Sequence, residues 1–221
     1  MVRRVLRAAA VVSVASLLTA CGRGPAALTL GSAPWQDGEV ARYDILDRDG
    51  NSVGGASFSV ARDGDVWLLS EDDAVGAVKQ CSRVRLDGTT LRPQSGEKEI
   101  HAPGTEATVR YTYAGENLEI EAVVNGEDRA ATVNVPENTL DNDQFLMTLR
   151  AMPFAEGYAG STLVVVPASA TRVTAIVRVL GKETLELPAG TFEAWRVELD
   201  FGQAKQHAWY QVEAPHRMLQ Y

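Results

Sequence analysis

The sequence predicts a mainly β domain, in which antiparallel strands follow one another as a meander and the sheet curls into a half-barrel or barrel. Three observations predict this fold. Apolar and polar residues alternate over many short runs, turn dipeptides separate the runs, and only one stretch has helical periodicity. A wide sheet that is apolar on one face is expected to curl, because strand twist accumulates and one helix covers little area.

The chain begins with the three parts of an export signal. Residues 1–20 contain a basic start, an apolar run over residues 8–18 and small residues before a cleavage point. The apolar run is too short for a spanning helix, which needs about 20 apolar residues. We therefore expect a signal peptide that is removed, not a membrane anchor.

A second motif overlaps the end of this signal. The sequence Leu18-Thr19-Ala20-Cys21-Gly22 resembles the lipobox of bacterial lipoproteins. This resemblance implies cleavage before Cys21 and diacylation of its thiol. The alternative is an ordinary secretory signal with a chance cysteine at the cut. We expect a protein held by its lipid on the extracytoplasmic side of the cell envelope, in either the outer or the cytoplasmic membrane.

The predicted organisation has three parts. A lipoprotein signal peptide covers residues 1–20, a lipidated tether without periodicity covers 21–34, and a single β-rich domain covers 35–221. Removing residues 1–20 leaves 18 basic residues of the original 21 and all 29 acidic ones, so the formal charge changes from -8 to 18 − 29 = −11. Nucleic acid is therefore excluded as an expected partner.

One thiol, Cys81, remains after acylation of Cys21, so no disulfide can form within the mature chain. The alternating residues around Cys81 indicate a strand cysteine and not a nucleophile. A disulfide between two molecules stays open.

Hairpin turns are predicted at five dipeptides, because tight turns need the positive φ that Asn, Asp and Gly tolerate. These dipeptides are Asp49-Gly50, Asp63-Gly64, Asp87-Gly88, Ala114-Gly115 and Asn125-Gly126. The clearest strand covers residues 106–113, followed by 118–124 and 131–135. Further strands are expected at 173–179, 185–187, 195–201, 207–212 and 216–221, with a turn at Pro188-Ala189-Gly190.

One amphipathic helix is expected over Asp141 to Ala151. Phe145, Leu146, Leu149 and Met152 share one face, and Asn138 or Asp141 is available as the N-cap. Pro153 ends the helix. If these apolar side chains fill the hollow of the curled sheet, the hollow is a core; otherwise the remaining volume is an apolar pocket.

Several phrases of the C-terminal half resemble a bacterial envelope family, the TapB-like family of uncharacterised-function domains. They are Leu149-Arg150-Ala151-Met152-Pro153-Phe154 with Gly157, the stretch from Leu187 to Val197, and Ala208-Trp209-Tyr210 before Pro215; Trp35, Gly38, Glu39 and Tyr43 fit the opening strand. The resemblance implies an exported β-rich domain, related in shape to the half-barrels of the LolA and LolB lipoprotein carriers. It implies no reaction.

No catalytic constellation stands out. The pattern Ser95-x-x-Lys98 lacks the accompanying elements of acylating serine enzymes, and the acidic loop at residues 44–51 lacks the downstream Glu of a calcium loop. His101, His207 and His216 lack ligand spacing, and a helix N-terminus explains Asp141 and Asp143. We predict no catalytic residue, no metal, no cofactor and no enzyme activity.

The leading hypothesis is a tethered module that binds a lipid or other hydrophobic ligand in the concave face of its sheet. The candidate ligand-binding residues are Tyr111, Tyr113, Phe145, Leu149, Trp195 and Trp209. The alternative is a structural or assembly factor of the envelope, with a filled barrel and an exposed strand edge at residues 216–221 for a protein partner of unknown identity. An extracytoplasmic enzyme is the third reading.

Overall fold

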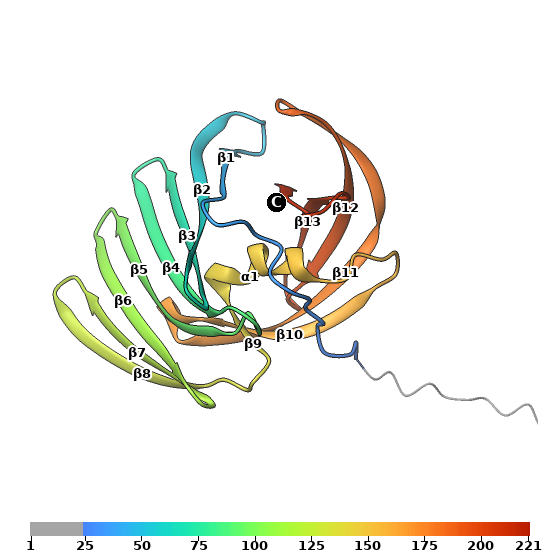
Figure 1. Cartoon of the computed structure of the whole chain (residues 1–221). Helices are drawn as coiled ribbons and strands as arrows, with labels where there is room; N and C mark the ends of the chain where they lie inside the picture. Colours follow the sequence, from blue (N-terminus) through green and yellow to red (C-terminus); the bar gives the residue numbers. More distant parts are fainter. Residues whose placement is uncertain (1–23) are drawn as a thin grey trace, which may run out of the picture.

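The computed structural model describes residues 24–221, so the predicted signal peptide and the predicted lipidation site at Cys21 lie outside the described residues. The first of two sheets contains eight strands in chain order (Figure 1). They are β1 (Val40–Leu46), β2 (Ser52–Asp63), β3 (Val66–Val75), β4 (Val78–Asp87), β5 (Pro93–Ala102), β6 (Thr105–Ala114), β7 (Asn117–Val124) and β8 (Glu127–Asn134). Every neighbouring pair is antiparallel, as a meander requires.

The second sheet contains six strands in the order β14-β13-β12-β11-β10-β9. They are β9 (Thr139–Asp141), β10 (Ala159–Val166), β11 (Thr171–Leu187), β12 (Gly190–Asp200), β13 (Lys205–Gln211) and β14 (Met218–Gln220). The predicted mainly β fold with a curled antiparallel meander is confirmed. The sheet is not continuous, however, because the chain enters the second sheet through β9, which pairs with β10 in parallel.

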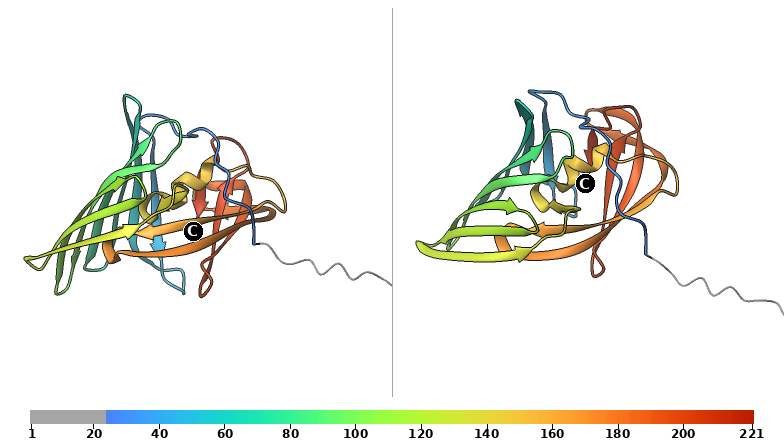
Figure 2. Two further views of the ribbon diagram at one scale, coloured as in Figure 1. Left: turned by 90° about the horizontal axis from the view of Figure 1, so that it is seen from below. Right: turned by 60° about the horizontal axis from the view of Figure 1, so that its bottom comes forward.

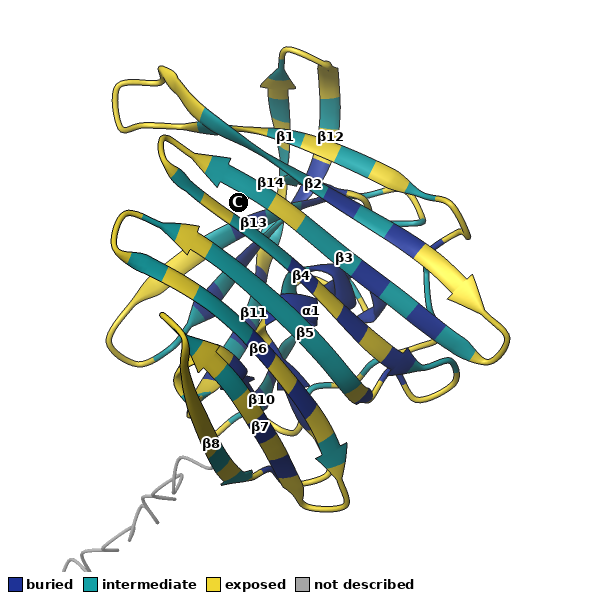
Figure 3. Cartoon of the chain, turned by 90° about the vertical axis from the view of Figure 1, so that its left-hand side faces the viewer, coloured by how far each residue is buried: buried dark blue, intermediate teal, exposed yellow. Residues whose placement is uncertain are grey.

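The predicted turn dipeptides all lie at junctions between consecutive strands of the first sheet. Between β7 and β8, Asn125 (φ 53°) and Gly126 (φ 82°) form the two-residue turn with positive φ at both positions. Burial alternates along β6 and β7, and Figure 3 shows these stripes of buried and exposed residues across the sheet. Local turn chemistry and the period of two therefore fix this half of the fold.

Strand β11 differs from its expected form. The sequence predicts separate strands over 173–179 and 185–187, whereas the structure contains one strand of 17 residues. A register shift between Val179 and Gly181 places Leu180 outside the regular pairing, with Leu180 45% exposed. Beyond this β-bulge, even-numbered positions such as Lys182, opposite Trp195, take the face that Val179 has opposite Val197, and the strand continues where the sequence predicted a break.

The one α-helix within residues 24–221 lies between the two sheets (Figures 1 and 2). Helix α1 (Asn142–Thr148) continues into the 3₁₀ helix η1 (Leu149–Ala151), which together confirm the predicted helix; a second 3₁₀ turn, η2, spans Pro167–Ser169. Asp141 is the N-cap, and its side chain accepts a hydrogen bond from the Asp143 amide at 2.9 Å.

The hollow between the sheets is filled. Side chains of α1 and η1 belong to one large apolar cluster with residues of both sheets, among them Phe145, Leu149, Trp195 and Tyr210. A smaller cluster under β6 and β7 contains Val109, Tyr111, Leu118, Ile120, Val135 and Val165. Because the apolar side chains of the helix fill the hollow, the centre of the concave face is a core and not a pocket.

The N-terminal segment lies against the domain, which differs from the expected free tether over 21–34. Ala27 forms a parallel bridge with Ser161 of β10, and the Gly31 amide donates to the Ala151 carbonyl at 2.7 Å. Leu28, Leu30 and Ala33 pack against the core. Residues 25–31, here called the strap, are coil as expected, but they are bound to the domain.

Candidate functional site

The six predicted ligand-binding residues do not line one cavity. Phe145, Leu149 and Trp195 are members of the large core cluster. Trp209 faces the side of β13 opposite the buried Tyr210, where its indole N–H donates to Glu183 and the Arg196 guanidinium lies 5.8 Å from its ring centroid. These four side chains therefore hold the fold or cover its outer surface.

Tyr111 and Tyr113 lie together at a different place. Their rings meet edge to face on the inner side of β6, with centroids 6.1 Å apart and an interplanar angle of 82°. Tyr111 is 3% exposed within the smaller apolar cluster, and Tyr113 packs against it. Tyr113 also lines an open cleft, which makes it the predicted residue best placed to contact a ligand.

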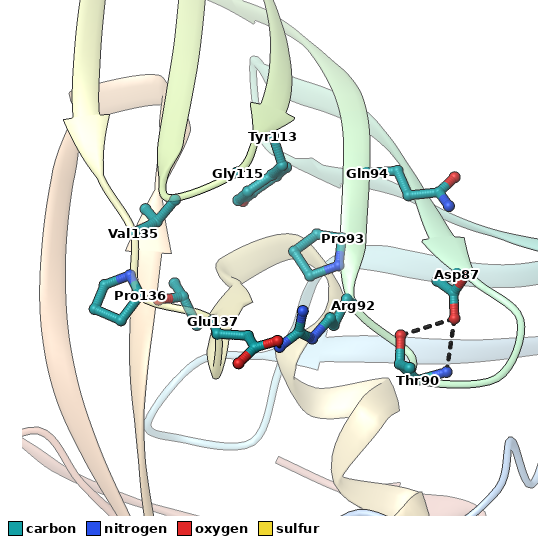
Figure 4. A pocket seen from close by; sticks show the side chains of 11 residues that line it. Asp87, Thr90, Arg92, Pro93, Gln94, Tyr113, Gly115, Val135, Pro136 and Glu137 are labelled. Atoms are coloured by element: carbon teal, nitrogen blue, oxygen red, sulfur yellow. Dashed lines mark hydrogen bonds and ion pairs between the residues drawn. The ribbon is translucent and has the colours of Figure 1, made fainter.

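The cleft has a volume of about 430 Å³ and lies at one end of the first sheet (Figure 4). The loop between β4 and β5, the β6–β7 turn and the linker from β8 to β9 surround it. Its lining residues are Asp87, Thr90, Arg92, Pro93, Gln94, Tyr113, Gly115, Val135, Pro136, Glu137 and Thr139. At the rim, Arg92 and Glu137 form an ion pair of 2.5 Å, and Asp87 accepts hydrogen bonds from Thr90.

Two of the residues that line the cleft, Tyr113 and Thr139, carry hydroxyl groups. The Tyr113 hydroxyl donates to Oδ2 of Asp141 at 2.7 Å. The Thr139 side chain, from a residue that is 4% exposed, has a buried hydroxyl without a hydrogen-bond partner. A buried polar atom without a partner costs free energy, so Thr139 marks a position where a ligand atom or water can bind.

Asp141 connects this wall to the helix. Its side chain is fully buried, and its two oxygens accept from Tyr113 and from the Asp143 amide. Burial, followed by the charge of Asp143, raises the pKa of Asp141, while the Tyr113 hydrogen bond opposes this rise. The Tyr111 hydroxyl lies close enough to influence the same carboxyl but has no hydrogen-bond partner of its own.

A buried ionic cluster continues from Asp143 along the inner face of the first sheet. Lys98 of β5 contacts Asp143 at 2.8 Å, with side chains 16% and 4% exposed. Burial, with a smaller effect of Asp143, raises the pKa of Glu71 on β3 to about 7, although Lys98 lowers it. Sequence reasoning considered Lys98 only in the Ser95-x-x-Lys98 pattern and did not identify Glu71, since only the strand register places both residues beside the helix.

The acidic group nearest the cleft is shielded. Asp141 can hold a proton near neutral pH, but its oxygens are occupied and shielded by Tyr113, so it does not reach an open reacting position. Within residues 24–221, no group of three or more acidic, His or Cys side chains is arranged to hold a metal ion. No helix in that range has the length and apolarity needed to cross a membrane.

The fold and the cleft define a two-sheet β domain with a filled interior and a small mixed polar and apolar cleft at one end. The chain belongs to the family described as "Protein of unknown function (DUF3108)", which matches residues 39–220. The match spans both sheets, and it assigns no reaction or ligand. Comparisons with curated proteins and with solved structures gave no match.

Proposed function

We propose that this protein is a lipid-anchored domain of the cell envelope that binds a small amphiphilic ligand in the Tyr113 cleft. The anchor is Cys21, as its resemblance to a lipobox implies. The observation that carries the binding proposal is that Thr139, one of the residues lining a cleft of about 430 Å³, has a buried hydroxyl without a hydrogen-bond partner. Small-molecule sites typically measure about 300 to 1,000 Å³.

The lining suggests what kind of ligand fits. Pro93 and Val135 are buried apolar residues in the lining, so the apolar part, or stem, of a ligand can pack against them. The Arg92 guanidinium is already paired with Glu137, and Asp87 adds a further acidic side chain, so this balance disfavours an anion. A head group with neutral hydroxyls can instead bond to Thr139 and Tyr113. The volume suits a head group and a short length of stem.

This proposal changes the location of the expected site. The sequence suggested a lipid in the concave face, whereas α1 occupies that space, so the cleft at the end of the sheet is the better candidate. The resemblance to TapB-like domains and to the shape of LolA and LolB remains a prediction, and it agrees with ligand binding by an exported domain. Binding without catalysis fits the buried, occupied state of Asp141.

The assembly alternative would use a free strand edge. Strand β14, where this edge was expected, has three residues, whereas β8 has eight and pairs with β7 alone. However, β8 begins with Glu127, Asp128 and Arg129, and such charges oppose pairing with another chain. We therefore propose ligand binding at the cleft. Isolation of a stable complex with a protein partner would instead favour the assembly role through the β8 edge.

The test is native mass spectrometry of the full chain released gently from the membranes of an expressing bacterium, followed by lipid extraction. We expect an adduct of one small amphiphile on the wild-type protein and its loss in Thr139→Val. Thr174→Val makes the same change on the exposed face of β11 and should keep the adduct. An adduct that survives Thr139→Val, or a mass without any adduct, would refute binding at this cleft.

A further inference from the structure

The strap is held on the same strand edge as the cleft wall. The Leu28 amide donates to the Ser161 carbonyl at 2.7 Å, and the Ser161 amide donates to the Ala26 carbonyl at 2.8 Å. Further along the same edge of β10, Leu163 pairs with Thr139. Ser161 and Leu163 are two residues apart, about 7 Å along a strand. The strap and the Thr139 wall are thus neighbours on β10.

Several independent contacts fix the strap there. Thr29 donates its amide to the Tyr158 hydroxyl at 2.9 Å, and the Ser161 hydroxyl donates to the Pro25 carbonyl at 3.1 Å. Gly160 leaves the space that the strap occupies, because a Cβ at this position would lie 2.9 Å from the Leu28 Cα. Figure 1 shows the strap (blue) passing beside α1 to reach β10.

A docked strap shortens the length of chain between Cys21 and its first attachment to the domain. Six chain steps from Cys21 to Ala27 span at most about 22 Å, at about 3.6 Å per step. A free tether from Cys21 to Pro34 would span up to about 47 Å by the same rule. With about 7 Å along β10 added, chain length allows the Thr139 wall to be at most about 30 Å from Cys21.

We infer that the strap holds the cleft end of the domain at the surface of the membrane that carries the Cys21 lipid, so that the cleft receives its amphiphile from that bilayer. This inference rests on the proposed function, because it requires the lipid at Cys21 and ligand binding at the cleft. What it adds to the proposed function is the orientation of the domain relative to the membrane. The occupant is the head group of a bilayer amphiphile, and a water-borne small molecule is the alternative source.

Orientation can be measured on the full, lipidated chain in phosphatidylcholine vesicles. In a Cys81→Ser background, a dye is placed at Thr89→Cys, on the β4–β5 loop beside the cleft, or at Ala77→Cys, on the β3–β4 turn at the opposite end of the sheet. Ten-residue strands separate these ends by about 33 Å. Energy transfer to acceptor-labelled lipids should be several-fold stronger from residue 89 than from residue 77.

The strap variant is Leu28→Pro, which removes the N–H that bonds to Ser161 and replaces the Leu side chain that packs against the core. It should reduce the difference between the two dyes to nearly nothing, whereas Thr29→Ala keeps its amide and should preserve the difference. Equal transfer from both dyes on the lipidated wild type would overturn the inference and leave the proposed function standing. A protein without the lipid mass on Cys21 would refute the anchor, and with it both proposals.

The source of the ligand is tested on the same vesicles. An alkyl glucoside, which has an apolar stem and neutral hydroxyls, is used as the probe in the bilayer and in water. If Leu28→Pro binds less of the glucoside than the wild type when the probe is in the bilayer, but equally much when it is in water, the ligand is delivered from the membrane. Equal binding of wild type and Leu28→Pro in both arrangements indicates a water-borne ligand and contradicts the inference.

Discussion

The Arg150 guanidinium and the Glu39 carboxylate form a bidentate ion pair that connects η1 to the segment before β1, with N–O distances of 2.7 and 3.3 Å. The Arg150 side chain is 1% exposed, and its Nε also donates to the Pro215 carbonyl at 3.2 Å. One buried cation thus joins the start of the first sheet, the helical segment and the loop before β14. This pair therefore connects three segments that are far apart in the sequence.

Glu39→Ala is expected to destabilise the domain strongly, because it leaves the Arg150 charge buried without its counter-ion. Removing one partner of a buried pair typically costs about 3 to 5 kcal/mol. Urea unfolding followed by tryptophan fluorescence measures this loss. The comparison is the double change Glu39→Leu with Arg150→Met, which removes both charges and should recover part of the stability. A double variant as unstable as Glu39→Ala would show that packing, not the uncompensated charge, is responsible.

Tyr113→Phe should cost about 1 to 3 kcal/mol, because it leaves Oδ2 of Asp141 buried without its donor. The matched control is Tyr111→Phe on the same strand, whose hydroxyl has a smaller effect on the same carboxyl than Tyr113 and whose removal should cost less. The Tyr113 bond favours the charged form of Asp141, so the loss should increase from pH 5 to pH 9. Equal losses in the two variants would contradict this distinction.

Glu71 predicts a specific pH dependence of stability. Its pKa is raised in the folded state to about 7 from the ordinary 4.5, so the folded protein binds the proton more tightly than the unfolded chain. The contribution of Glu71 to stability is therefore present below about pH 4.5 and is lost as the pH rises toward 7. Glu71→Gln should raise the free energy of unfolding at pH 8 by up to about 3 kcal/mol and change it little at pH 4.5.

The control for Glu71→Gln is Glu121→Gln, an exposed change on the outer face of β7. Urea unfolding of both variants and the wild type at several pH values gives the difference directly. If Glu71→Gln and the wild type lose stability in parallel between pH 4.5 and 8, Glu71 is not the group that titrates there.

Gly96→Ala tests how closely β5 approaches its neighbours. A Cβ at Gly96 would lie 2.4 Å from the Tyr111 hydroxyl and 2.7 Å from the Arg83 carbonyl oxygen, and the backbone contact cannot relax cheaply. We expect a loss of about 1 to 3 kcal/mol in thermal or urea unfolding. Gly55→Ala on β2 meets only a carbonyl at 3.4 Å and should be much milder. Similar losses in both would remove the steric explanation.

The meander was predictable because its signals are local. The Asn125-Gly126 turn and the alternation over Glu106 to Tyr113 each specify a structure within a few residues, and the structure contains both. Asp141 as a helix cap was predictable for the same reason. The parallel pairing of β9 with β10 was not, since the choice of a strand partner depends on how the whole chain packs.

The cleft was only partly predictable. Tyr113 was identified from its strand pattern, but Thr139 became informative only when its hydroxyl was found buried without a partner. Lys98 and Asp143 are 45 residues apart, and no sequence pattern connects them. Trp209 was misplaced because alternation predicts two faces of a strand but does not identify the buried one, and here Tyr210 is inside.

Thr139→Val separates ligand binding from stability. The Thr139 hydroxyl is buried without a partner, so replacing it with a methyl group of similar size removes an unsatisfied polar atom. The free protein should be unchanged or up to about 1 kcal/mol more stable, while the ligand adduct is lost. Because a bound ligand stabilises the fold by mass action, adding it should raise the melting temperature of the wild type more than that of Thr139→Val. A free Thr139→Val protein that is clearly less stable than the wild type would mean that the hydroxyl already has a structural partner, such as a bound water, and that it is not held for a ligand.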